Sequence, residues 1–296
     1  LSPTSYAFSG GGAEAINAID TTTEAYVSGG GVDVDNGLAV TAQDNATSMA
    51  DVVSTAVAAG LISMAAGGSV VNSTVMSTVN AYLDVPTVHG GEVTISATAV
   101  PRADVFAAGV NAGTLAVGGS SAVATVSSTV SAWAGGHITA DALRITAVSN
   151  DYLFAESMAG AGGAFTGVGA DSRITNNNTT LVKLEDSAVI NVGILELTSE
   201  HTQDVDSKAD AFSLALASGS GAGAHNTFTG KAAVDIGTGV AVTADPGVHA
   251  GGHDGPRGLR AVGNRRVPLP RHAQSVDAGS AGVAGTATDR QTAETA

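Results

Sequence analysis

The chain has 296 residues, of which 13 % are charged and 4 % are aromatic, and its formal net charge is −15. This negative charge repels phosphate backbones, which argues against nucleic acid as a partner. The lack of Cys excludes disulfides and thiolate metal sites, and no apolar run reaches the about 18 residues that would predict a membrane-spanning helix.

Self-similar segments recur along the chain. The first motif is Glu24-Ala-Tyr-Val27 in its first copy, and the second residues of the five copies are Ala25, Ala81, Ala132, Val182 and Ala232, spaced by 56, 51, 50 and 50 residues. A second motif follows each copy, from Leu38–Ala42 in the first to Val240–Ala244 in the fifth, and it begins at Leu195 in the fourth. Two motifs that keep one order five times predict a repeat architecture.

Glycine-rich stretches precede each copy of the first motif. They are Gly10–Gly12, Gly67–Gly68, Gly118–Gly119, Gly160–Gly163 and Gly219–Gly223. We interpret these stretches as corners between strands.

Within each repeat the hydrophobic pattern has the period of two that is typical of strands. Between Ser121 and Trp133 one face carries Ala122, Ala124, Val126, Ser128, Val130 and Ala132. The earlier copies keep the same phase, because Ile19 and Val75 precede their motif Ala by six residues, as Val126 does. A slip by one residue would turn this face outward, so we predict that it is the buried face.

These patterns predict an all-β fold: a parallel β-helix, or β-solenoid, built from about five repeats of about 50 residues over residues 1–245. Each repeat holds either two coils or one coil of long strands, and the sequence does not decide between them. Two rivals stay open. A stack of antiparallel sandwich domains would need hairpin turns such as Val34–Gly37, and the Ala-rich stretch Ala46–Gly60 allows a helix.

The composition changes at Pro246. Residues 246–296 hold four of the seven Pro, are rich in Gly and Arg, and lack both motifs. Because Pro has no amide donor, we expect that the strand ladder does not continue here. We interpret residues 246–296 as a non-repetitive tail that is disordered or results from a shift of the reading frame.

One candidate metal site lies in the first repeat. Asp33 and Asp35 offer hard oxygen ligands two residues apart within a Gly-rich segment, as in calcium loops. The segment departs from the repetitive calcium-binding nonapeptide and from the EF-hand, so a solvated turn is the alternative. Calcium is the only cofactor for which we find a candidate site.

One candidate ligand site is aromatic. Tyr26, Tyr82 and Trp133 occupy the same position in three successive repeats, on the face opposite the small core residues. Stacked coils would align them as an exposed ladder that could bind sugar rings, or that packs beneath a covering strand. The fourth and fifth repeats have Lys183 and Ala233 there, so we expect the ladder to end.

Two further surface features are weaker. Asp204, Asp206 and Asp210, with Glu200 and His201 nearby, could gather a cation, although a solvated acidic edge that opposes aggregation is the simpler interpretation. Flat Thr-rich solenoid faces can bind ice, but the run Thr21–Thr23 does not recur as a regular array, so we expect no ice binding.

We predict no enzymatic activity. The chain has no nucleophile-elbow sequence between a strand and a helix, and no phosphate-binding loop. A β-helical lyase or hydrolase acting on acidic polysaccharide is the alternative. It would need clustered cations, whereas the repeats hold only Arg102, Arg144, Arg173, Lys183, Lys208 and Lys231, which do not cluster in sequence.

The repeat texture of residues 1–245 resembles the repeat regions of large bacterial exoproteins, such as filamentous-haemagglutinin-like and autotransporter-type adhesins. The resemblance implies a secreted stalk or passenger at the bacterial cell surface or outer membrane, with roles in adhesion or biofilm. It implies cell-surface or matrix glycans or proteins as partners. The start at Leu1, without Met or a signal peptide, fits a segment cut from a longer protein.

Overall fold

The computed structural model describes residues 5–256 and contains no helix among them. Eight strands follow one another: β1 (Tyr6–Ser28), β2 (Val32–Asp44), β3 (Thr47–Val57), β4 (Ile62–Ala99), β5 (Arg102–Ala112), β6 (Leu115–Leu184), β7 (Val189–Ile236) and β8 (Ala241–Pro256). The helix considered for the Ala-rich stretch from residue 46 is wrong, because most of it forms β3. Its Val, Thr and Ser side chains favour a strand, and alternate side chains are buried.

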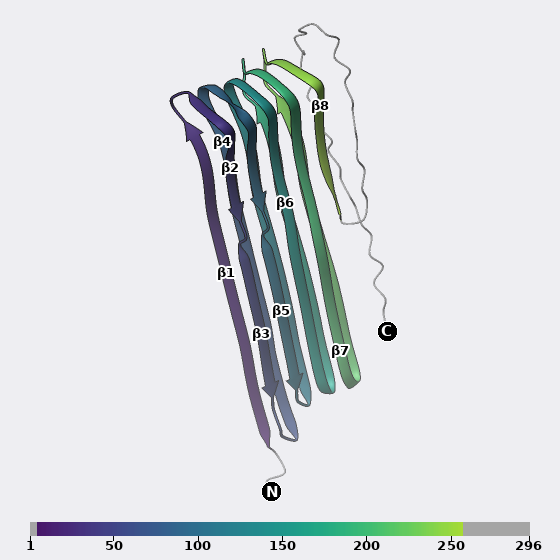
Figure 1. The fold of residues 1–296 in the computed structure, drawn as a ribbon. Helices are drawn as coiled ribbons and strands as arrows, with labels where there is room; N and C mark the ends of the chain where they lie inside the picture. The colour runs from purple at the N-terminus through teal and green to yellow at the C-terminus, as the bar shows by residue number, and fades with distance from the viewer. Residues whose placement is uncertain (1–4, 257–296) are drawn as a thin grey trace.

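Each repeat forms one coil of long strands. β1 runs along one leg of the first coil, and β2 and β3 return along the other leg (Figure 1). The second coil then covers the first, since β4 pairs with β1 and β2, and β5 pairs with β3, all in parallel. Every ladder between described strands is parallel, so the antiparallel sandwich is wrong and the solenoid is confirmed.

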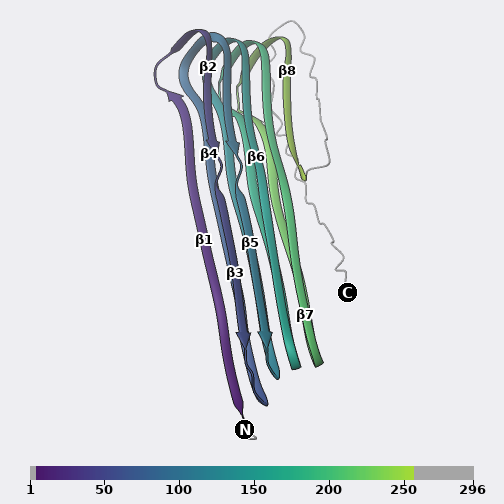
Figure 2. The same cartoon turned by 60° about the horizontal axis from the view of Figure 1, so that its bottom comes forward.

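The coils are flat and elongated. β1 alone has 23 residues, which corresponds to a strand of roughly 75 Å. Figure 2 shows the coils side by side from β1 to β8, with turns at both ends of the legs. Long legs explain why one coil uses about 50 residues.

The core lies between the two legs and is made of small side chains. Val71, Val75 and Val79 are fully buried, as are Ala122, Ala124 and Val126 in the next coil. The inward face predicted from the period of two is therefore confirmed. In β1 the equivalent residues are half-buried, because the first coil has a neighbour on one side only within the described part of the chain.

Most of the repeated Gly stretches are not corners, so that prediction is wrong for all of them except Gly160–Gly163, which reaches a corner because Gly162 pairs with Ala112 at the end of β5. Gly67 lies inside β4, paired with Gly11 of β1 and Gly118 of β6. A Cβ atom at Gly67 would stand 2.5 Å from the Gly11 carbonyl oxygen and 2.6 Å from Oδ1 of Asn111 on the facing leg. Glycine is needed here because the two legs approach closely.

Other glycines form the corner at which the first leg of a coil ends and the return leg begins. Gly29 joins β1 to β2 with φ of 106°, and Gly136 occupies the corresponding corner of the third coil with φ of 85°. A side chain would strain both positions, since positive φ disfavours residues with a Cβ atom.

The last coil is offset from the predicted alignment. Val182 pairs with Val234 rather than Ala232, and Leu195 pairs with Val248 rather than Val240. The spacing is therefore 52 to 53 residues (234 − 182 and 248 − 195), not 50 or fewer. Consecutive small residues in this repeat make the two alignments similar in sequence.

β8 crosses the predicted boundary at residue 245. The ladder pairs Val192 with Ala244 and Ile194 with Gly247, so Asp245 and Pro246 lie at an irregularity opposite Gly193, and pairing then continues to Pro256. The expectation that the ladder stops at Pro246 is thus wrong, because Pro is tolerated at a bulge. Residues 257–296 of the predicted tail lie outside the described residues.

Candidate functional site

The aromatic residues form a stacked ladder. Tyr26 of β1, Tyr82 of β4 and Trp133 of β6 are in register across the three strands. The rings of Tyr26 and Tyr82 have centroids 4.9 Å apart at an interplanar angle of 6°, and those of Tyr82 and Trp133 are 4.4 Å apart at 3°. The repeat register alone aligns them, as the sequence predicted.

Stacking decides which ring surfaces a ligand can reach. Tyr82 has a ring on each face, so only its edge points outward. Tyr26 is the end of the stack and is 55 % exposed. The ladder therefore does not offer three separate ring faces to a sugar.

The phenol of Tyr82 lies in a negative environment. Its pKa is raised above 10.0, first by desolvation and then by the charges of Glu24, Tyr26 and Asp84. The Asn80 amide Nδ2 donates to Glu24 Oε1 at 3.1 Å on the same face. The ladder therefore combines neutral phenols with a polar rim.

The row changes character beyond Trp133. Lys183 takes the next position by spacing, and it pairs in the ladder with Asp235, not with the predicted Ala233. Lys183 Nζ lies 2.8 Å from Glu185 Oε2, and this hydrogen bond raises the pKa of Lys183 despite desolvation. The aromatic row thus ends in charged residues.

The structure places Asp33 and Asp35 on the outer face of β2, where both are exposed. The neighbour of Asp33 in β4 is His89. Within the described part of the chain, no three His, Asp or Glu side chains gather as a metal site would require. Calcium binding there stays a prediction without a third protein ligand.

His201 does not lie beside the acidic residues of β7. Asp204, Asp206 and Asp210 alternate along the outer face, and Lys208 Nζ lies 3.1 Å from Asp210 Oδ2. His201 points inward and is 1 % exposed. The grouping of His201 with these carboxylates is wrong, because strand alternation sends it to the other side of the sheet.

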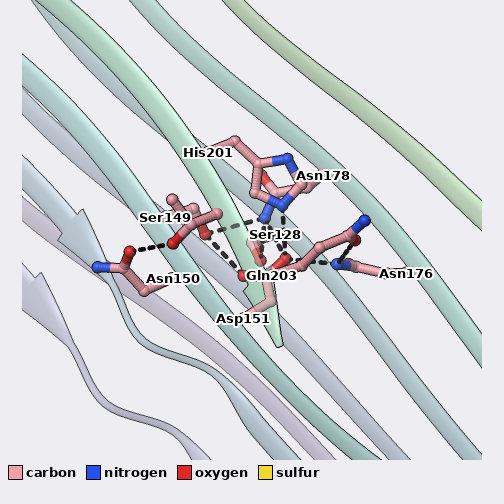
Figure 3. A network of polar contacts seen from close by, with 9 residues as sticks. Ser128, Ser149, Asn150, Asp151, Asn176, Asn178, His201 and Gln203 are labelled. Carbon is pink, nitrogen blue, oxygen red and sulfur yellow. Dashed lines mark hydrogen bonds and ion pairs between the residues drawn. The ribbon is translucent and has the colours of Figure 1, made fainter. Parts of the chain in front are cut away.

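A polar network fills part of the core instead (Figure 3). The buried Asp151 carboxylate accepts from Asn178 Nδ2 at 2.7 Å and from Asn176 Nδ2 at 2.8 Å, and its Oδ2 lies 3.0 Å from His201 Nε2. Ser149 Oγ donates to the other carboxylate oxygen at 2.9 Å. The network joins the two legs, because Asp151 belongs to the return leg and both Asn to the facing one.

This network was not predicted as a unit. The run of Asn and Thr from Asn176 to Thr180 is by sequence equally compatible with an Asn ladder or a turn, whereas the structure places it in β6 and buries alternate residues of it. The phase of the neighbouring inward residues Ile174 and Val182 was the available signal. Four donors around one carboxylate fix the relative position of the legs, so we assign the network a structural role.

Most Arg and Lys side chains of the described residues form ion pairs with carboxylates of this chain. Arg144 bridges Glu92 and Glu196, and these two carboxylates raise its pKa. The other ion pairs are Arg102 with Asp104, Arg173 with Asp171, Lys183 with Glu185, and Lys208 with Glu156 and Asp210. The described surface therefore has no cluster of free cations.

Threonine does recur in rows, contrary to the expectation from residues 21–23. Thr22, Thr78 and Thr129 stand in register on the outer face, and Thr74 and Thr125 stand in a second row. The row between them holds Asp20, Met76 and Ser127. This mixed row interrupts the regular array of Thr side chains that an ice-binding face would need, so we still expect no ice binding.

Two grooves lie on the outer faces. One, of about 420 Å³, follows Gly68, Gly119 and Gly169, whose missing side chains leave a trough across three coils. The other, of about 360 Å³, is lined by Arg102, Ala103, Tyr152, Leu153, Phe154, Asp204 and Asp206. Only the second combines aromatic and charged side chains.

Comparison with protein-family models, curated proteins and solved structures finds no match to this chain. No helix that could cross a membrane occurs among the described residues.

Proposed function

We propose that this chain is a structural and adhesive segment, a stalk or passenger, of a large secreted bacterial surface protein. Its partners are glycans or proteins of cell surfaces or the extracellular matrix. The single observation that carries the proposal is the common register of the coils, which places equivalent outer residues in rows at the roughly 4.8 Å spacing of neighbouring strands.

Rows of this kind favour contact over catalysis. Flat faces with repeated side chains offer many equivalent weak contacts to an extended partner, and linked weak contacts bind strongly together. The aromatic ladder, through the outward edges of its rings, gives the best-defined point of contact for a glycan.

The alternative, a polysaccharide lyase or hydrolase, has less support. An enzyme of that kind binds a polyanion, so it needs cations that are free to contact the substrate. Arg102, Arg144 and Lys208 are each held by carboxylates of this chain.

The test is binding of the full chain to arrays of glycans and matrix proteins and to bacterial and host cells, with assays for release of unsaturated uronate from pectin and alginate. We expect saturable binding without turnover. Saturable uronate release would contradict the proposal and favour the enzyme.

A further inference from the structure

We propose that this chain binds a second copy of itself through the outer face of the leg that contains β1, at the end where β1 begins. The inference goes beyond the proposed function and does not rest on it. It is carried by an apolar ridge and an apolar groove that run side by side across the coils. In the dimer each copy inserts its ridge into the groove of the other.

The ridge is a row of large apolar side chains in register. Phe8 of β1 pairs with Met64 of β4, and Met64 pairs with Leu115 of β6. Phe165 continues the row in the fourth coil, because its amide donates to the carbonyl of Thr114, the residue before Leu115. Phe8, Met64 and Phe165 are 76 %, 44 % and 58 % exposed. The row therefore projects from the sheet into solvent.

The groove follows a row of glycines four residues further along each strand, at positions 12, 68, 119 and 169 against 8, 64, 115 and 165 for the ridge. Gly12, Gly68 and Gly119 are in register, and a Cβ atom at Gly119 would stand 3.5 Å from the carbonyl oxygen of Gly169 in the next coil. The groove has a volume of about 420 Å³. Ridge and groove thus lie roughly 13 Å apart along the strands.

The constant interval between ridge and groove makes this face self-complementary. The row midway between them contains Ala66 and Val117, which pair with each other. A two-fold axis along this row brings each ridge residue over the glycine of the same coil in the other copy, so that Met64 meets Gly68. A two-fold interface of this kind uses the same surface of both copies.

Charge favours this face over the rest of the surface. Two copies of a chain with net charge −15 repel each other wherever their carboxylates meet. The segments that form the face contain no Asp, Glu, Lys, Arg or His; they are residues 5–13, 61–70, 112–121, 162–170 and 214–222. Glu14 and Asp171 lie at the rim, one row beyond the groove. In the dimer each is roughly 26 Å from its own copy, well beyond the Debye length of about 8 Å.

The area of the face is sufficient for a weak dimer. It extends over about eight residues along the strands and across five coils, which gives roughly 26 Å by 24 Å. This corresponds to on the order of 600 Å² per copy, at the lower end of specific interfaces. We therefore expect reversible association with a dissociation constant in the micromolar range.

Sedimentation velocity of the full chain at increasing concentration measures this association. We expect a monomer–dimer equilibrium in which the dimer predominates at roughly 100 µM. A monomer at every concentration would overturn the inference. Binding of that monomer to phosphatidylcholine vesicles would then assign the face to a lipid surface instead.

Two variants change the ridge and the groove separately. Phe165→Asp places a charge on the ridge, and Gly169→Leu fills the groove at a position where a Cβ atom has no neighbour closer than 3.9 Å. We expect each to weaken dimerisation at least roughly tenfold, with an unchanged circular dichroism spectrum. Val53→Asp is the matched control, because it adds the same charge at a 62 % exposed position on the other leg. Equal losses in the two Asp variants would mean general repulsion and would contradict the interface.

The two-fold axis has a direct test, because the chain has no Cys. Val117→Cys lies on the axis and is 50 % exposed, so under mild oxidation it should form a disulfide with the same residue of a second copy. Adding Phe165→Asp to this variant should abolish the cross-link. Val53→Cys, away from the face, should cross-link far more slowly. Equal rates for the two Cys variants would show that the copies meet without this symmetry and would overturn the proposed dimer.

Discussion

His201 Nε2 lies 3.0 Å from Asp151 Oδ2 although the two residues are 50 positions apart in sequence, and both side chains are buried. They belong to neighbouring coils, β7 and β6, and Asn176 and Asn178 reach the same carboxylate from the facing leg. Asp151 is thus the point where two coils and two legs meet.

We predict that Asp151→Ala lowers the free energy of unfolding by about 3–5 kcal/mol, because it leaves buried donors without their acceptor. Urea unfolding followed by circular dichroism measures this. Asp33→Ala, at an exposed position, should change it by less than about 0.5 kcal/mol. Equal effects of the two substitutions would contradict the role of the network.

The ring stack should show energetic coupling. In a double-mutant cycle of Tyr26→Ala and Tyr82→Ala, we expect a coupling of about 0.5–1.5 kcal/mol, as for stacked aromatic pairs. A cycle of Tyr26→Ala with Tyr152→Ala, in separate strands that do not pair, serves as the control and should give a value near zero. Absence of coupling in the first cycle would mean that the rings do not stack in solution.

Tyr82 should titrate above the ordinary tyrosine pKa of 10.0, because desolvation and then Glu24, Tyr26 and Asp84 raise its pKa. A raised pKa means that the folded state favours the neutral phenol. The resulting stability is complete below pH 10 and is lost as the pH rises through the folded-state pKa.

The measurement is the tyrosinate absorbance of the wild type minus that of Tyr82→Phe, followed with pH. We expect the difference to titrate above pH 10 and to move down in Glu24→Gln. A difference curve with its midpoint at or below pH 10 would contradict the desolvated, negatively charged environment of the Tyr82 phenol.

Gly67 should not tolerate a side chain. Gly67→Ala would bring a Cβ atom to 2.5 Å from the Gly11 carbonyl oxygen of the neighbouring coil and to 2.6 Å from Asn111 Oδ1 of the facing leg, so we expect a loss of about 1–3 kcal/mol in stability. Gly219→Ala is the matched control, because a Cβ atom there has nothing within 4 Å. If thermal unfolding shows the same midpoint for both variants, the legs are not as close as the structure has them.

The sequence was sufficient to predict what depends on strand alternation and repeat spacing. The inward position of Val126 and the alignment of Tyr26 with Tyr82 follow from those two patterns alone. The role of Gly67 could not be predicted, because it depends on Asn111 of the facing leg.

Contacts between the two legs are what the sequence pattern could not predict. The pattern places Asn178 inside, but nothing in its neighbourhood in sequence identifies Asp151 as its acceptor. The groove that Arg102 lines was missed for a similar reason. Its lining comes from three coils, and the sequence singled out Arg102 and the acidic residues of β7 without indicating that they lie together.

The most direct test of the in-register coils is a distance between spin labels on the first and last of them. The chain has no Cys, so Ile16→Cys and His225→Cys would carry the only labels. The two positions lie in one row that crosses all five coils. Ile16 pairs with Asn72, and Asn72 pairs with Val123. Arg173 follows Val123 by the same 50 residues that separate Ser128 from its hydrogen-bond partner Asn178, and Arg173 pairs with His225. Double electron–electron resonance should give one narrow distribution near four strand spacings, roughly 19 Å. A broad distribution, or one centred well beyond 30 Å, would contradict the stacked solenoid and the rows of side chains on which the proposed function depends.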